Sequence, residues 1–262
     1  MVERKTTTTT TINGLTVFFL EISAITWFAI RFLKVVFKPR YEIKEFIHQC
    51  YLIGNKSLPL VAITGFIMGV VLTLQSRPTL AHFGAESWLP AMVAVSLIRE
   101  ISPVITALIC AGKIGSGIGA ELASMKVTEQ IDAMEVSGTN PFKYIVVTRI
   151  LATTLMIPLL VIFSDFVGIF GSYLGVNIQD PISYHLFGAK IFNRLDFIDV
   201  IPAFIKTFFF GFAIGLIGCY QGYTSDHGTE GVGKAANSAV VRASLLIFVI
   251  DMLAVQVTNL FM

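Results

Sequence analysis

The run LPLVAITGFIMGVVLTL, from Leu58 to Leu74, contains no charged side chain, and threonine supplies its few polar groups. Gly65 and Gly69 within it are four residues apart, which places two small residues on one face of a helix. A helix needs about 20 predominantly apolar residues to cross a bilayer. Because backbone groups in lipid must be satisfied within the spanning structure, this run predicts a membrane-spanning helix.

Four further apolar runs extend the pattern to the C-terminus: Trp88–Cys110, Tyr144–Leu174, Val200–Tyr220 and Val240–Phe261. The 262 residues are 55% hydrophobic and 14% charged, whereas soluble domains contain about 25% charged residues. The sequence lacks the short alternating segments that are typical of membrane β-barrels. It therefore predicts an all-α integral membrane protein with about five transmembrane helices.

The N-terminal part of the chain differs in composition from these spans. Residues 1–13 contain an unbroken run of threonines and are expected to form a disordered tail. Residues 14–37 are apolar but are interrupted by charged side chains: Glu21, Arg31 and Lys34. This pattern favours an amphipathic helix in the membrane interface, and a tilted span is the alternative. We expect residues 14–53 to form this helix and a cytoplasmic turn, and residues 54–262 to form the transmembrane domain.

Basic residues are distributed unequally between the two predicted sides of the membrane. One side collects the lysines and arginines of residues 31–56, 113–143 and 234–242, and the other those of residues 77–82 and 185–194. The first side is richer in basic residues and is therefore expected to be cytoplasmic. The N-terminus then lies inside and, after five spans, the C-terminus lies outside. A net charge of +2 leaves too little basic surface for binding nucleic acid.

Two glycine-rich segments have the outward form of nucleotide-binding loops. Gly228–Lys234 has the spacing of a P-loop, but the next residue is Ala235, where a serine or threonine would meet Mg²⁺. Gly115–Gly119 has the wrong final spacing for a dinucleotide fingerprint, and no strand precedes it. Catalytic triads, metal-ligand motifs and paired cysteines are also missing from the sequence. We therefore expect no cofactor, no metal site and no catalytic activity of the chain's own.

Polar residues return between the second and third apolar runs, in Gly112–Asn140. Within this segment Glu121–Glu135 predicts one amphipathic helix, because its apolar side chains recur at helical spacing, and Gly138 and Pro141 end it. The apolar stripe consists of Leu122, Met125, Ile131 and Met134, and the polar positions include Lys126, Glu129, Asp132 and Glu135. A helix of this kind in the cytoplasm is suited to docking in a groove of another protein. A loop helix that rests on the membrane surface is the alternative.

The run AGKIGSGIGAELASMKVTEQIDAMEVSGTNPFKYIVVTRILA, residues 111–152, resembles the signature of the MlaE family of ABC-transporter permeases. SLIREISP, residues 96–103, and GVGKAANSAVV, residues 231–241, are similar to the family as well. The resemblance extends from about Gly54 to the C-terminus. The chain departs from the family's usual arginine at Lys113, and its outer segment, residues 176–199, is the least similar part.

The resemblance implies the permease of a phospholipid transporter in a bacterial inner membrane, with its C-terminus in the periplasm. The implied partners are a second copy of the chain, a cytoplasmic ABC ATPase, a periplasmic ring of MCE-domain subunits and a small STAS-type accessory subunit. The segment at about 113–138 would be the coupling helix that the ATPase receives. The residues assigned to this contact are Glu121, Leu122, Met125, Lys126, Glu129, Asp132 and Met134.

Charged side chains also fall inside the predicted spans. Arg99, Glu100 and Lys206 would each cost at least a few kcal/mol in lipid unless paired or hydrated. Arg99 and Glu100 are adjacent, so their side chains point about 100° apart and cannot simply pair face to face. Pairing between helices, for instance of Glu100 with Lys206, is one interpretation. The other, which the resemblance favours, is a polar patch in a lipid-holding cavity, and its assigned residues are Arg99, Glu100, Lys206 and Phe209.

Two other kinds of function are weighed against lipid transport driven by a separate ATPase. A gradient-driven secondary transporter would use Glu100, Asp165 and Asp251 as proton-linked carboxylates, and it predicts inverted repeats, which the sequence does not display. A membrane scaffold without transport does not need charges inside its spans, where they are costly. For Asp165 and Asp251, polar contacts between helices are the default expectation.

Overall fold

The computed structural model describes residues 14–38, 42–178, 181–226 and 228–261, and regular structure in these ranges is entirely helical. The predicted disordered tail, residues 1–13, lies outside the described residues. The chain divides into two compact units, Met1–Pro39 and Arg40–Met262. The all-α prediction is confirmed for the described part of the chain.

The first unit contains helix α1 (Gly14–Val36). Its charged residues and its exposed Trp27, which lies under the guanidinium of Arg31 at 6.0 Å, are typical of a helix in a membrane interface. Among the described residues, α1 is not one of the segments that are long and apolar enough to cross a membrane. Its interfacial position stays a prediction.

In the described part of the second unit, five helical segments are long and apolar enough to cross a membrane, as predicted: Ile43–His82, Glu86–Val127, Phe142–Asn177, Phe197–Tyr223 and Thr229–Leu260. The first is the single helix α2 (Ile43–His82). It begins well before the predicted span, so residues 43–53, expected in the cytoplasmic turn, are helical, and residue 54, where the transmembrane domain was expected to begin, lies inside this helix.

The second span is built from short helical pieces joined end to end. They are η1 (Glu86–Trp88), α3 (Leu89–Ser96), η2 (Leu97–Ile101), α4 (Ser102–Cys110), η3 (Ala111–Gly115) and α5 (Ser116–Val127). The remaining elements are α6 (Gln130–Val136), η4 (Phe142–Val147), α7 (Thr148–Asn177), α8 (Tyr184–Phe192), α9 (Phe197–Tyr223) and α10 (Thr229–Phe261). The elements η2, η3 and η4 are π-helical turns, which are uncommon and frequently occur at functional sites.

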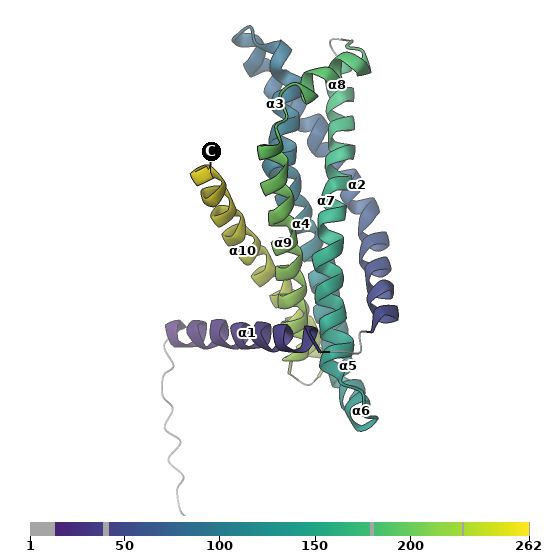
Figure 1. Cartoon of the computed structure of the whole chain (residues 1–262). Coiled ribbons are helices and arrows are strands. Elements are labelled where there is room, and N and C mark those ends of the chain that lie inside the picture. The colour runs from purple at the N-terminus through teal and green to yellow at the C-terminus, as the bar shows by residue number, and fades with distance from the viewer. Residues whose placement is uncertain (1–13, 39–41, 179–180, 227, 262) are drawn as a thin grey trace, which may run out of the picture. The chain divides into compact units, whose positions relative to one another are not determined.

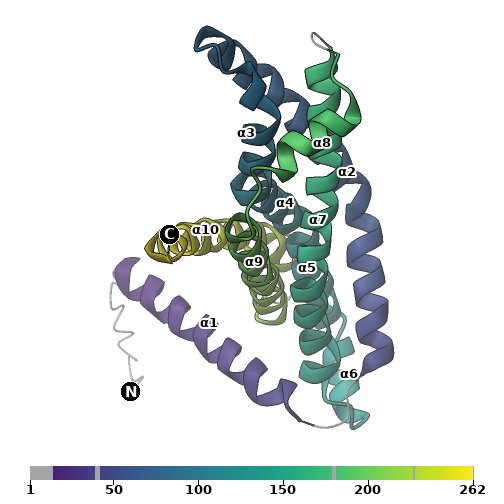
Figure 2. The same cartoon turned by 45° about the horizontal axis from the view of Figure 1, so that its top comes forward.

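The helices of the second unit pack mainly side by side, as Figures 1 and 2 show. Helix α2 lies along α7, α7 also packs against α9, and α10 packs against α9 and α5. In Figure 1, α5 and α6 lie at the lower end and α8 lies at the upper end. These ends correspond to the two sides of the membrane that the distribution of basic residues predicts. Which end faces the cytoplasm stays a prediction.

Gly65 and Gly69 of the apolar run Leu58–Leu74 form the seam between α2 and α7. A Cβ atom added at Gly69 would lie 1.9 Å from the carbonyl oxygen of Gly168, and one at Gly65 would lie 2.7 Å from the Ser164 hydroxyl. The two backbones therefore approach too closely for any side chain at Gly69. Near the same seam, the buried hydroxyl of Thr73 donates to that of Ser172 at 2.8 Å. Close packing of small residues and hydroxyl hydrogen bonds is how membrane helices associate without a hydrophobic driving force.

The π turn η2 has a local cause in the sequence. Pro103 carries no backbone N–H, so the carbonyl of Arg99, four residues earlier, has no α-helical donor. The backbone N–H of Ser102 instead donates to the carbonyl of Leu97, five residues back, which is the bond of a π turn. The extra residue in this turn changes the direction of the side chains within it, including Arg99 and Glu100.

The predicted single helix Glu121–Glu135 is wrong, because it is two helices. Helix α5 ends at Val127, and Glu129 adopts a left-handed backbone conformation with φ of 57° before α6 begins at Gln130. Gly138, with φ of +81°, follows the end of α6, as the sequence predicted. The segment is therefore a short helical hairpin, and its first half continues the second span.

Candidate functional site

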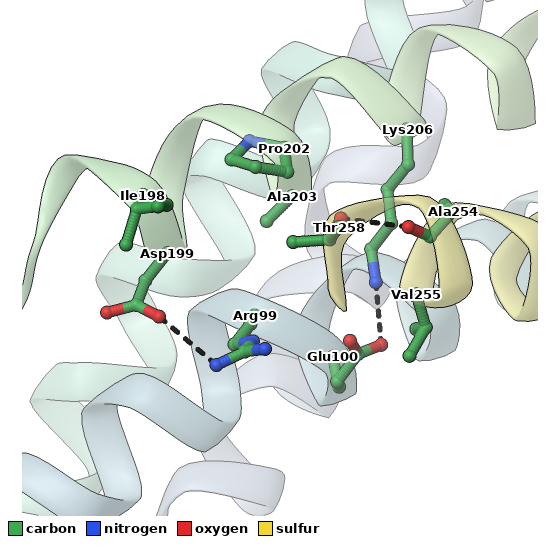
Figure 3. Close-up of a pocket in the computed structure, with 10 residues that line it drawn as sticks. All are labelled: Arg99, Glu100, Ile198, Asp199, Pro202, Ala203, Lys206, Ala254, Val255 and Thr258. Atoms are coloured by element: carbon green, nitrogen blue, oxygen red, sulfur yellow. Dashed lines mark hydrogen bonds and ion pairs between the residues drawn. The ribbon is translucent and has the colours of Figure 1, made fainter. Parts of the chain in front are cut away.

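Charged side chains from three spans meet where η2 lies against α9 and α10. The ammonium of Lys206 on α9 donates to a carboxylate oxygen of Glu100 on η2 at 2.6 Å and to one of Asp251 on α10 at 2.9 Å. Figure 3 shows the Lys206 side chain extending from α9 toward Glu100. Lys206 is only 5% exposed, so these two carboxylates take the place of its lost hydration. The predicted pairing of Glu100 with Lys206 is confirmed, and so is an inter-helix contact for Asp251.

A second ion pair lies beside the first. The Arg99 guanidinium is 3.3 Å from a carboxylate oxygen of Asp199, near the start of α9 (Figure 3). Asp199 also accepts from the backbone N–H of Asp196, in a reciprocal cap that fixes the first turn of the helix. Asp199 and Lys206 are seven residues apart, two helical turns, and so share one face of α9. Arg99 and Glu100 thus pair with that same face, and not with each other, as the sequence predicted.

These five side chains, which we call the charged cluster, comprise Arg99, Glu100, Asp199, Lys206 and Asp251. They carry two positive and three negative formal charges. Most of them line a small pocket with a volume of about 20 Å³, the one drawn in Figure 3, which is room for about one water molecule. Each cation therefore has a carboxylate partner, the cluster keeps one excess negative charge, and the pocket itself has no room for a headgroup in this conformation.

Phe209, which was predicted with this group, does not line the pocket and is 57% exposed. Its neighbour Phe210 is fully buried in the helix packing. Helical geometry separates Phe209 from Lys206 by one turn and about 60° around the helix, and its side chain faces outward. The structure therefore brings Arg99, Glu100 and Lys206 together, but not Phe209.

Asp165 on α7 lies outside the charged cluster. Its carboxyl lies beside the hydroxyl of Ser102 on α4, as expected for a polar contact between helices. One of its oxygens is buried and has no hydrogen-bond partner among the described residues. Asp165 also borders an apolar pocket of about 270 Å³ between α4, α7 and α9.

The residues predicted to contact an ATPase are divided between the chain's own interior and the outer face of the α5–α6 hairpin. Glu121 accepts a hydrogen bond from the buried Arg149 guanidinium on α7 at 2.8 Å. Leu122 is fully buried against Gly222 of α9, and Lys126 donates to the carbonyl oxygen of Ser225 at 2.7 Å. Met125 and Met134 are half-buried, whereas Glu129 and Asp132 are exposed.

The glycine motifs that imitate nucleotide loops are helical. Gly231, Gly233 and Lys234 lie in the first turns of α10, and Lys234 forms an ion pair with Glu230 at 2.7 Å. Gly115–Gly119 runs through η3 and α5. Among the described residues, neither segment presents a loop of backbone N–H groups that could hold phosphates.

Comparison with known proteins agrees with the resemblance in the sequence. The family model described as Permease MlaE matches residues 46–257, which cover nearly all of the five spans and include the charged cluster. The chain belongs to the MlaE permease family. This MlaE-family chain is 42% identical over 226 residues to a probable ABC transporter permease protein of Rickettsia prowazekii, and the match covers 86% of each chain.

More distant MlaE-family relatives match over similar lengths. A probable ABC transporter permease protein of Synechocystis is 34% identical over 214 residues, which cover 82% of this chain and 81% of the relative. The intermembrane phospholipid transport system permease protein MlaE of Haemophilus influenzae is 34% identical over 207 residues, which cover 78% of this chain and 79% of the relative.

Two paired charges of this MlaE-family chain were not identified from the sequence: Asp199 in the charged cluster and Arg149 outside it. Asp199 was counted with the outer segment, although the pattern Asp196-x-x-Asp199 is a helix-start signal that could have placed it at the first turn of a span. Arg149 lies in the third apolar run and was not weighed as a buried charge, although an arginine at this depth predicts a carboxylate partner. That partner is Glu121.

Proposed function

We propose that this chain is the membrane subunit of an ABC transporter that moves phospholipids, and that a separate ATPase subunit drives it. The observation that carries the proposal is the charged cluster, because five ionisable side chains inside the spans are costly unless they serve a purpose. The family supports transport, and the name of the Haemophilus influenzae relative, an intermembrane phospholipid transport system permease protein, supports phospholipid as the substrate.

The charged cluster suggests how a headgroup is received. Each carboxylate of the cluster already lies against a cation, and the pocket holds about one water molecule. We propose that a headgroup enters when η2, α9 and α10 separate. A phospholipid headgroup offers a phosphate that can replace a carboxylate beside Lys206 or Arg99. A zwitterionic headgroup also offers an ammonium that can pair with Glu100 or Asp251. Exchange of partners therefore keeps every charge compensated during passage.

The remaining parts of the proposed assembly follow from the family. The exposed residues of the α5–α6 hairpin, including Glu129 and Asp132, are proposed to dock on the ATPase. The opposite end, where α8 lies, is proposed to meet a periplasmic MCE-domain ring. We further propose a homodimer, a STAS-type accessory subunit, and a position in the bacterial inner membrane with the N-terminus cytoplasmic and the C-terminus periplasmic.

The experiment reconstitutes the chain with its ATPase in phospholipid vesicles and follows transfer of a fluorescent phospholipid on addition of ATP. Glu100→Gln combined with Lys206→Met should stop transfer while the ATPase still co-purifies, and Lys190→Met on α8 serves as the control. Normal transfer by the double variant would contradict the site. Transfer that needs a proton gradient and not ATP would favour the gradient-driven alternative.

The proposal that a separate subunit hydrolyses ATP is tested with the purified chain alone. We expect no ATP hydrolysis, because Gly231 and Gly233 of the P-loop-like motif lie in helix α10 and Ala235 occupies the position of the Mg²⁺-binding hydroxyl. Sustained hydrolysis by the chain without an added ATPase would contradict the proposal.

A further inference from the structure

A second site lies beside α2, apart from the charged cluster. It is an open groove with a volume of about 730 Å³ between α2, α4 and η3. Its lining residues are Lys56, Pro59, Leu60, Ile63, Ile109, Gly112 and Lys113. None of these residues lines the pocket of Figure 3.

The two lysines of the groove mark a membrane–water boundary. Lys56 comes two residues before the apolar run that starts at Leu58, and Lys113 comes three residues after the run that ends at Cys110. The Lys113 ammonium donates to the backbone carbonyl of Lys56, so both residues lie at the same end of the groove. Positive side chains at this level of a span are typical of the headgroup region.

Within the described residues, no carboxylate balances the positive charges of the groove. Neither the Lys56 nor the Lys113 ammonium forms an ion pair within the described part of the chain. Both residues are exposed. By contrast, Lys206 on α9 has two carboxylate partners. The groove therefore presents two positive charges that are available to an anion.

The rest of the groove is apolar and extends from the lysines into the membrane span. Leu60 and Ile63 are 39% and 59% exposed and lie one to two turns beyond Lys56 on α2. Ile109 lies one turn beyond Lys113, and Gly112 leaves the wall open, since a Cβ atom there would meet nothing within 4 Å. Charge at the boundary and an apolar floor below it match an amphiphile with an anionic head.

We propose that this groove binds an anionic phospholipid from the leaflet on the α5–α6 side of the membrane. Its phosphate lies between the ammonium groups of Lys56 and Lys113, and the first part of an acyl chain lies on Leu60, Ile63 and Ile109. The apolar floor selects a lipid over free phosphate, because a small anion would leave these side chains uncovered. The site does not rest on the proposed transport function, since a bound lipid of this kind needs no passage through the charged cluster.

Native mass spectrometry of the full-length chain in detergent tests the proposal. Phosphatidylglycerol and phosphatidylcholine with the same acyl chains are titrated separately. The chain should prefer phosphatidylglycerol, and Lys56→Gln with Lys113→Gln should weaken that binding about 25-fold. This is about fivefold for each lysine, the equivalent of about 1 kcal/mol. Lys44→Gln with Lys234→Gln removes the same charge from the same predicted side of the membrane and should leave binding unchanged.

Two further measurements distinguish the occupants. Lys56→Arg with Lys113→Arg should restore binding, which shows that lost affinity is not lost folding. A phosphatidylglycerol with a photoreactive acyl chain should label the peptides that contain Ile63 and Ile109. Equal phosphatidylglycerol affinity in both glutamine pairs, or full displacement of the lipid by inorganic phosphate, would overturn the proposal. A loss of dimer in place of a loss of lipid would show that a second copy covers the groove, and would overturn it as well.

Discussion

Lys206 and Glu100 come from different spans, and their charged groups are 2.6 Å apart. The Lys206 side chain is 5% exposed and that of Glu100 is 40% exposed, so the lysine depends on protein partners far more than the glutamate does. Asp251 is a second partner of the same ammonium, at 2.9 Å. Loss of Lys206 should therefore destabilise the protein more than loss of Glu100.

Removal of the lysine should be the most damaging single change in this group. Lys206→Met leaves Glu100 and Asp251 without a cation inside the spans, and we expect it to lower the free energy of unfolding by about 3 kcal/mol. Glu100→Gln leaves the Lys206–Asp251 pair intact and should cost less than about 1 kcal/mol. Thermal unfolding of the purified variants in detergent measures both effects. Equal destabilisation by the two variants would show that Asp251 does not hold the lysine.

The seam between α2 and α7 should not tolerate even a methyl group at Gly69. A Cβ atom there would lie 1.9 Å from the carbonyl oxygen of Gly168, so the two helices must separate. We expect Gly69→Ala to lower the free energy of unfolding by about 1–3 kcal/mol. Gly188→Ala in α8 is the matched control, because a Cβ atom there meets nothing within 4 Å. Helix propensity should make that change neutral or stabilising. If the Gly69→Ala and Gly188→Ala variants have the same melting temperature, the close approach of α2 and α7 at Gly69 does not limit stability.

The left-handed conformation of Glu129 makes the α5–α6 hairpin sensitive to the residue at this position. Its φ of 57° suits glycine, costs an ordinary L-residue about 1–2 kcal/mol, and is outside the range of proline. We expect Glu129→Gly to preserve folding and, under the proposed function, co-purification of the ATPase. Glu129→Pro should displace α6 and release the ATPase. Retention of the ATPase by the proline variant, measured by affinity purification, would contradict docking through this hairpin.

The sequence predicted the spans because their cause is local. An uncharged run such as Leu58–Leu74 can cross lipid only as a helix. The Gly65–Gly69 spacing predicted a packing face, which the structure confirms. The Glu100–Lys206 pair was also predictable, because each charge inside a span requires a partner and few partners exist.

Other features could not be predicted because they depend on tertiary packing. A glutamate at position 129 does not predict a left-handed backbone conformation, and the apolar periodicity of Glu121–Glu135 continues through this residue. The burial of Leu122 depends on its approach to Gly222, which lies 100 residues later in the chain. The pocket size at Lys206 likewise depends on how three spans meet. Sequence periodicity identifies the apolar face of a helix, but it does not state which neighbour covers that face.

The two acidic residues Glu121 and Asp132 should separate the stability of the hairpin from its proposed docking. Glu121 accepts from the buried Arg149 guanidinium at 2.8 Å, whereas Asp132 is exposed and has no partner among the described residues. Glu121→Ala leaves Arg149 buried without its carboxylate, so we expect the free energy of unfolding to fall by about 2 kcal/mol. Asp132→Ala should leave thermal unfolding unchanged and weaken co-purification of the ATPase. If Asp132→Ala lowers the melting temperature as much as Glu121→Ala does, the outer face of α6 is a folding surface, because a residue that only meets a partner cannot alter the stability of the isolated chain.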